Sequence, residues 1–199
     1  MTILLALAIS LFPSIALALP ITFDLRAPAI ESIDEVNSFS LTQGGLTATL
    51  TAEPTTFNQP PLRNLLLNQT ASSFGINVDG TTCGGLEQSG LIDGGCTGES
   101  VAVIFSRDVI LNSLRVSSFG STDEGLVTIG ATTIDILSTG THSLGNTFLS
   151  GGSAWSLAFV AGNGFSFDSF TVTPVPEPSS LLLLGIGLVV LALIQRRPG

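Results

Sequence analysis

Ser38-Phe-Ser-Leu-Thr-Gln-Gly-Gly-Leu-Thr-Ala-Thr-Leu50 carries the clearest local signal of the fold in this sequence. Two short β-like runs, 38–42 and 46–50, flank Gln43-Gly44-Gly45. A glycine pair between two such runs is typical of a β-hairpin. The stretch therefore predicts two antiparallel strands joined by a tight turn.

Similar β-like runs, separated by turn residues, occur on both sides of this hairpin. Gly130-Ala131-Thr132 indicates a second hairpin, and further β-like runs occur at 21–25, 101–105, 109–111, 114–116, 126–129, 133–137, 155–159 and 165–172. A short helix is expected at 62–68, and residues 171–178 are expected to form a linker. Roughly nine or ten strands separated by Gly-rich and Ser-rich turns favour an all-β, antiparallel β-sandwich of the jelly-roll type over residues 19–173, with Phe165 and Phe167 in its core or on a sheet face.

The charge of this middle segment limits its partners. Between the two apolar ends the chain has 14 acidic residues, four Arg and no Lys. Its negative field argues against nucleic acid and anionic lipid surfaces as partners.

Residues 1–18 are typical of a secretory signal peptide. An apolar run at 3–11 is followed by Pro13, and Ala16-Leu17-Ala18 has the small-x-small pattern of a cleavage site. We therefore expect export by the Sec translocon and cleavage by signal peptidase after Ala18. The alternative is an uncleaved anchor, although the apolar run is short for a membrane span.

Cys83 and Cys96 bracket twelve Gly-rich and polar residues. In an exported protein this arrangement predicts a disulfide, which would contribute ~3 kcal/mol in the chain-entropy model. A zinc site would need four ligands, and only His142 remains to help. A redox pair would normally be closer in sequence.

The sequence contains no recognisable catalytic set. His142 is the only imidazole and is expected to be a polar loop residue, and Gly151-Gly-Ser-Ala-Trp155 lacks the final glycine of a nucleophile elbow. The absence of Lys excludes Schiff-base chemistry. We therefore expect a protein that is not an enzyme and has no catalytic residues.

Carboxylates in predicted loops leave two other kinds of site open. A surface hydrolase could use two acidic residues across a glycosidic bond, although solvated turn carboxylates are the simpler interpretation. Calcium, which takes oxygen ligands from loops, is the one cofactor considered. Its weak candidate ligands are Asp93, Glu99, Asp123, Glu124 and Asp168, to which Asp108 is added for the hydrolase.

The last part of the chain, residues 174–199, has three sections with different chemistry. Two prolines make Val175-Pro176-Glu177-Pro178-Ser179 extended and exposed. The uncharged run 181–194 predicts a single transmembrane helix of roughly 21 Å, short of a ~30 Å bilayer core, and Arg196 and Arg197 follow it in the tail 195–199 on the expected cytoplasmic side. The short span suits a temporary anchor; an ordinary tail anchor and a buried core helix are the alternatives.

This order of motif, short span and arginine pair closely resembles the PEP-CTERM sorting signal of exported bacterial proteins. Pro176-Glu177-Pro178 matches the tripeptide of that family, and Val175 and Ser179 occupy its usual flanks. The resemblance implies an inner-membrane anchored precursor, recognition by an exosortase, which is a membrane cysteine transpeptidase, and cleavage near 176–178. Delivery to the cell envelope or extracellular matrix would follow.

The body between the two ends loosely resembles the ectodomains that precede this tag, some of which are likened to carbohydrate-binding jelly rolls. Together these features predict a structural or adhesive protein associated with exopolysaccharide. The alternative is a carbohydrate-binding surface module, calcium-assisted, with Trp155 or a Phe on an exposed face.

Overall fold

Twelve β-strands form the regular structure of the computed structural model, which describes residues 18–26, 36–54, 65–70, 72–78, 90–94, 98–176 and 187. The strands are β1 (Ile21–Asp24), β2 (Ser38–Gln43), β3 (Leu46–Pro54), β4 (Leu65–Gln69), β5 (Phe74–Val78), β6 (Glu99–Phe105), β7 (Val109–Ser117), β8 (Glu124–Ile129), β9 (Thr132–Ile136), β10 (Gly140–Leu149), β11 (Ala154–Ala161) and β12 (Ser166–Pro174).

The chain divides into two units, and the strands all belong to one of them. This body spans Leu19–Val175, and the other unit combines Met1–Ala18 with Pro176–Gly199. Most of the second unit lies outside the described residues, and with it most of the predicted signal peptide and membrane helix. In the part of the chain that is described, no helix is long and apolar enough to span a bilayer.

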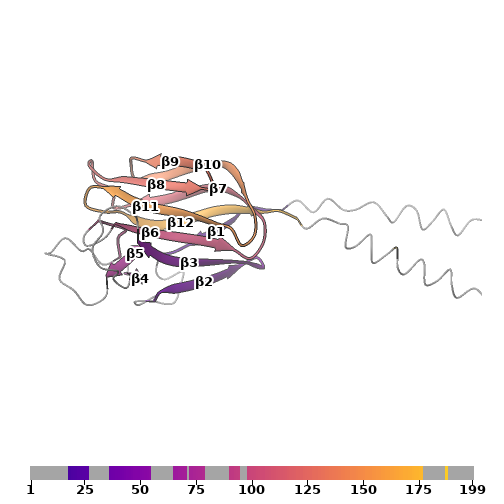
Figure 1. The fold of residues 1–199 in the computed structure, drawn as a ribbon. Helices are drawn as coiled ribbons and strands as arrows, with labels where there is room; N and C mark the ends of the chain where they lie inside the picture. Colours follow the sequence, from indigo (N-terminus) through magenta and orange to yellow (C-terminus); the bar gives the residue numbers. More distant parts are fainter. Residues whose placement is uncertain are drawn as a thin grey trace, which may run out of the picture. The chain divides into compact units, whose positions relative to one another are not determined.

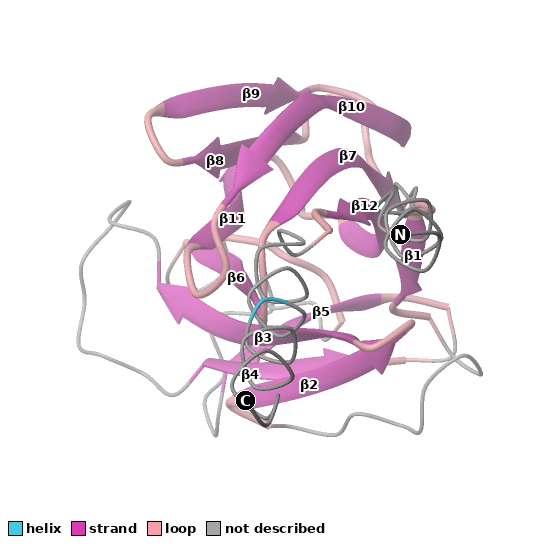
Figure 2. Ribbon diagram, turned by 90° about the vertical axis from the view of Figure 1, so that its right-hand side faces the viewer, coloured by secondary structure: helices cyan, strands magenta, loops and turns pink. Residues whose placement is uncertain are grey.

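Two antiparallel sheets make up the body, together with a separate strand pair. One sheet has the order β1-β12-β7-β10, the other has the order β2-β3-β6-β11-β8-β9, and β4 pairs with β5. The strands of the two sheets overlap in the view of Figure 1, whereas Figure 2, turned by 90°, shows the larger sheet curving around the smaller one. The all-β, antiparallel sandwich predicted from the sequence is confirmed.

The connections give this sandwich a jelly-roll topology. The chain crosses between the sheets from β6 to β7 to β8, and crosses again from β9 to β10, β11 and β12. As a result β1-β12-β7-β10 faces β6-β11-β8-β9, the interleaved double Greek key of an eight-stranded jelly roll. The β2–β3 hairpin extends the second sheet beyond β6.

Both hairpins predicted from glycine-containing turns are present. β2 and β3 pair from Ser38↔Thr51 to Gln43↔Leu46 around Gly44 and Gly45, which have φ of 56° and 72°. Two central residues at positive φ form the turn that matches strand twist best. β8 and β9 pair in the same way around Gly130, at φ 58°.

Aromatic side chains fill the space between the two sheets. Phe23 stacks on Phe170 at 4.9 Å between ring centroids, and Trp155 meets Phe170 edge-on at 5.9 Å. Phe165 and Phe167 are fully buried, so their predicted core positions are confirmed. Such offset and edge-to-face pairs add to the stability that burial alone provides.

Three local predictions were wrong. Residues 65–68, expected within a helix at 62–68, belong to β4, because this strand pairs with β5 on one side and Leu67 pairs with Val36 on the other. The segment expected to hold His142 in a loop is instead β10, paired with β7 along its length and interrupted by a bulge between Ser143 and Thr147. Long-range pairing outweighs local propensity in both segments.

The third error concerns the expected linker. Residues 171–174 belong to β12 and pair with β7 up to Pro174↔Val109. The folded body therefore continues to the first residue of the predicted sorting segment.

Candidate functional site

The start of the sorting segment is hydrogen-bonded to the body. Val175 donates its backbone N–H to the carbonyl of Asp108 at 2.9 Å, and Pro176, the next residue, is exposed. Because proline has no N–H, the hydrogen-bonded ladder cannot continue through Pro176. The extended peptide predicted from the two prolines thus begins directly at the end of β12.

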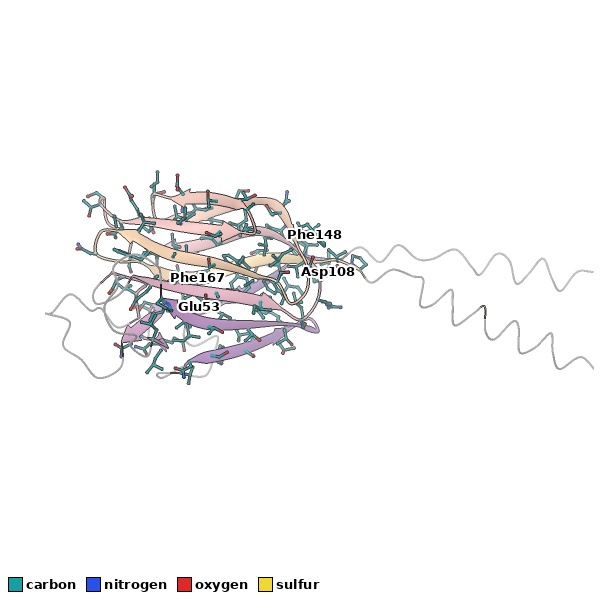
Figure 3. The ribbon with its side chains drawn as sticks, in the orientation of Figure 1. Glu53, Asp108, Phe148 and Phe167 are labelled. Atoms are coloured by element: carbon teal, nitrogen blue, oxygen red, sulfur yellow. The ribbon has the colours of Figure 1, made fainter. Side chains whose placement is uncertain are left out.

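The side chain of Asp108 also joins two turns of the body. Its Oδ1 accepts the N–H of Gly151 at 2.8 Å, which joins the β6–β7 turn to the β10–β11 turn. A Cβ on Gly151 would approach Arg107 Cα to 2.7 Å, so the two turns touch closely. Asp108 and the exposed Phe148 lie at the same end of the ribbons in Figure 3. The carboxylate of Asp108, considered for hydrolysis, serves here as a structural acceptor.

Most other residues predicted for export, for sorting or for the disulfide lie outside the described residues. They are Ala16, Cys83, Cys96, Glu177, Pro178, Ser179, Arg196 and Arg197. The signal cleavage site, the disulfide and the basic membrane flank therefore stay predictions.

Asp123, one of the calcium candidates, connects two loops. It is 4% exposed, and its carboxylate accepts the N–H of Gly120 at 2.5 Å and that of Asn163 at 2.7 Å. Gly162, at φ 100°, lies so close that a Cβ there would overlap Asp123 Oδ1. The carboxylate of Asp123 therefore joins the two loops and lies in close contact with Gly162.

Asp168 is likewise bound by protein groups. Its Oδ1 accepts hydrogen bonds from Ser117 Oγ at 2.7 Å and Ser166 Oγ at 3.1 Å, and its Oδ2 lies 3.4 Å from Arg115 Nε. A register shift between Phe167 and Ser169 turns this side chain toward β7. Partners of this kind are what a buried carboxylate requires.

The remaining calcium candidates lie in different settings. The backbone N–H of Asp93 donates to Glu99 Oε2 at 2.8 Å, and both residues are buried, whereas Glu124 is exposed. Within the described ranges, no three His, Cys, Asp or Glu side chains are grouped so that they could hold a metal ion. Calcium binding stays a prediction.

The structure places His142 against the backbone of Ser138 and Trp155 in the core. His142 Nε2 lies 2.8 Å from the carbonyl oxygen of Ser138, so its contact is to the backbone. Trp155 or a Phe was expected on an exposed face; Trp155 is only 1% exposed, so that part of the prediction is wrong, whereas Phe148 is 56% exposed. The alternation of Trp155 with Ala154 and Ser156 places it on the inward side of β11.

A groove that the sequence did not predict lies between β1 and β2. Its cavity volume is about 290 Å³, and it is lined by Thr22, Phe23, Asp24, Leu41, Thr42 and Gln43. β1 and β2 are edge strands of different sheets, so the groove follows an open side of the sandwich. Only the pairing of distant strands brings these two short segments together.

An ion pair lies on the β1 side of this groove. Arg26 Nε and Nη2 donate to Asp24 Oδ1 at 3.0 Å and Oδ2 at 2.9 Å, and the backbone N–H of Arg26 adds a bond to Oδ1 at 3.1 Å. These hydrogen bonds from Arg26 lower the pKa of Asp24 below its ordinary value. Asp24 is therefore an ionised acceptor at neutral pH.

Comparison with known proteins identifies the sorting segment. Residues 174–197 match the family model of the PEP-CTERM protein-sorting motif. No curated protein and no solved structure matches this chain. The chain therefore carries the PEP-CTERM motif, through which exosortases sort exported proteins to the cell surface.

Proposed function

We propose that the jelly-roll body is a non-enzymatic structural or adhesive component of the cell envelope or extracellular matrix, associated with exopolysaccharide. In this proposal the Sec translocon exports the chain, signal peptidase cuts after Ala18, and residues 181–194 hold the precursor in the inner membrane until exosortase acts. The match of residues 174–197 to the sorting motif is the observation that carries the proposal.

The surface chemistry of the body supports an association with polysaccharide. Cross-strand hydroxyl pairs occur on both sheets: Thr22–Thr171 and Ser40–Thr49 at 2.9 Å, and Thr42–Thr47 at 2.8 Å. Hydroxyl groups both donate and accept hydrogen bonds, as the hydroxyl groups of sugars do. A net charge of −9 with no Lys disfavours polyanionic partners.

The test compares the protein recovered from its native host with a variant in which Pro176-Glu177-Pro178 is replaced by three alanines. We expect the mass of the wild-type protein to lack residues 1–18 and everything beyond about Pro178, and the variant to keep its tail and stay in the membrane fraction. A wild-type protein that keeps its tail would contradict sorting by cleavage. Recovery of the mature protein only from the cytoplasm would contradict export.

A carbohydrate-binding surface module is the second candidate function. The polar groove between β1 and β2 favours it, since hydroxyl, amide and carboxylate groups line one cavity. Calcium assistance belongs to this candidate. Binding to a glycan array in the presence and absence of calcium tests carbohydrate binding and its dependence on calcium. If the protein binds no glycan in either condition, this function is contradicted.

A further inference from the structure

We propose that the groove between β1 and β2 binds one neutral sugar residue of a polysaccharide chain. This inference rests on the proposed association with exopolysaccharide and names the place where the contact is made.

The size and position of the groove suit a single ring within a polymer. Its volume of about 290 Å³ lies just below the roughly 300–1,000 Å³ that is typical of sites for whole small molecules, which suits one ring of a longer chain. Thr22, Thr42 and Gln43 are exposed, so the groove is open to solvent. A ring can therefore enter it while the neighbouring units of the chain remain outside.

The polar groups of the groove match the hydroxyl groups of a sugar. Asp24 Oδ1 already accepts two hydrogen bonds from Arg26, whereas Oδ2 accepts one. Because a carboxylate oxygen has two lone pairs, Oδ2 can accept a further hydroxyl proton. The amide of Gln43 and the hydroxyls of Thr22 and Thr42 supply donors as well as acceptors.

The apolar part of the groove is small. Leu41 is half-buried and packs against the core, so it is the apolar side chain of the lining that a sugar ring can contact. Phe23 also lines the groove but is only 1% exposed, so its ring belongs to the core. Contact of Leu41 with the C–H groups of a sugar removes apolar surface from water, which is favourable.

Charge selects a neutral sugar over an acidic one. The carboxylate of Asp24 is ionised and would repel a uronic acid, sulfate or phosphate group. Arg26, which is not one of the lining residues, uses its Nε and Nη2 donors on Asp24, so its positive charge is already paired. Neutral pyranose rings carry no charge, so the Asp24 carboxylate does not repel them.

The experiment uses the full-length chain in detergent micelles. Binding is measured by isothermal titration with neutral oligosaccharides of glucose, mannose, galactose and N-acetylglucosamine, and with oligouronates as the acidic probe. Asp24→Asn should weaken binding of the best neutral probe by about tenfold and Gln43→Ala by about fivefold, the losses expected for a charged and a neutral hydrogen bond.

Asp135→Asn and Thr133→Ala serve as matched controls, because both residues are exposed on β9, at the edge of the six-stranded sheet opposite to β2. These controls should bind as wild type does, and thermal melting confirms that each variant is folded. Equal affinities of wild type, Asp24→Asn and Gln43→Ala would overturn the proposal, and so would a preference for oligouronates.

A second measurement separates this inference from the proposed function. Polysaccharide purified from the host matrix is sedimented with wild type and with the two groove variants. If all three proteins co-sediment equally, the matrix association stands and the groove assignment is wrong. If wild type does not co-sediment and binds no neutral probe, both proposals are wrong.

Discussion

At the scale of single residues, Asp123 illustrates a buried carboxylate whose role is structural. Its two hydrogen bonds join the Gly120 turn to the loop containing Gly162 and Asn163. Because two backbone N–H groups depend on one carboxylate, replacing Asp123 removes both hydrogen bonds at once. The same carboxylate was a calcium candidate by sequence, and its contacts explain its burial without an ion.

We expect Asp123→Ala to lower the free energy of unfolding by about 3 kcal/mol, because two charge-assisted hydrogen bonds are lost together. Urea denaturation of the variant and of wild type measures the difference. Asp135→Ala, an exposed carboxylate on β9, is the matched control and should change stability by less than about 0.5 kcal/mol. Equal stability of the Asp123 variant and the control would contradict this role.

At the scale of elements, β12 leads directly to the sorting motif. Pro174 pairs with Val109 and Val175 is bonded to Asp108, while the matched motif begins at residue 174. Five residues separate Val175 from Leu181 and could span at most about 22 Å when extended. Under the proposed membrane span at 181–194, an enzyme that cuts within this segment would have to act within that distance of the end of β12.

Inserting Gly-Ser-Gly-Ser between Val175 and Pro176 should speed removal of the tail, because the cleavage segment is then farther from the folded strand. Pulse-chase labelling in the host measures the rate of the mass change. The same insertion combined with replacement of Pro176-Glu177-Pro178 by alanines is the control and should remain uncut. An unchanged rate would show that the end of β12 does not hinder the enzyme.

At the scale of the whole molecule, the core between the two sheets defines one body from Leu19 to Val175. Cys83 and Cys96 fall within this body in sequence, although they lie outside the described residues. A cross-link between them would restrict the unfolded chain and so raise the stability of the folded body.

We expect reduction of the exported protein to lower its melting temperature by roughly 6–12 °C, the shift that corresponds to ~3 kcal/mol in a domain of this size. Thermal melts with and without reductant measure it. A variant with both cysteines changed to serine should melt at the same temperature in the two conditions. Free thiols in the exported protein, found by alkylation and mass measurement, would contradict the disulfide.

The sequence by itself was enough for features that depend on a few neighbouring residues. Gly44 and Gly45 supply the positive φ that a two-residue hairpin needs, and Pro176-Glu177-Pro178 identified the sorting motif that the family model matches. Short β-like runs were sufficient for the all-β class. These properties are local, so they can be recognised before any tertiary contact is known.

Only the tertiary structure decided where side chains meet across the chain. β4 and β10 are strands because distant partners complete their hydrogen bonds, and Trp155 is buried because a second sheet covers its face. The groove needs Asp24 and Gln43 on edge strands of different sheets. Pairings between residues far apart in sequence set the neighbours of each side chain, and local periodicity does not identify those neighbours.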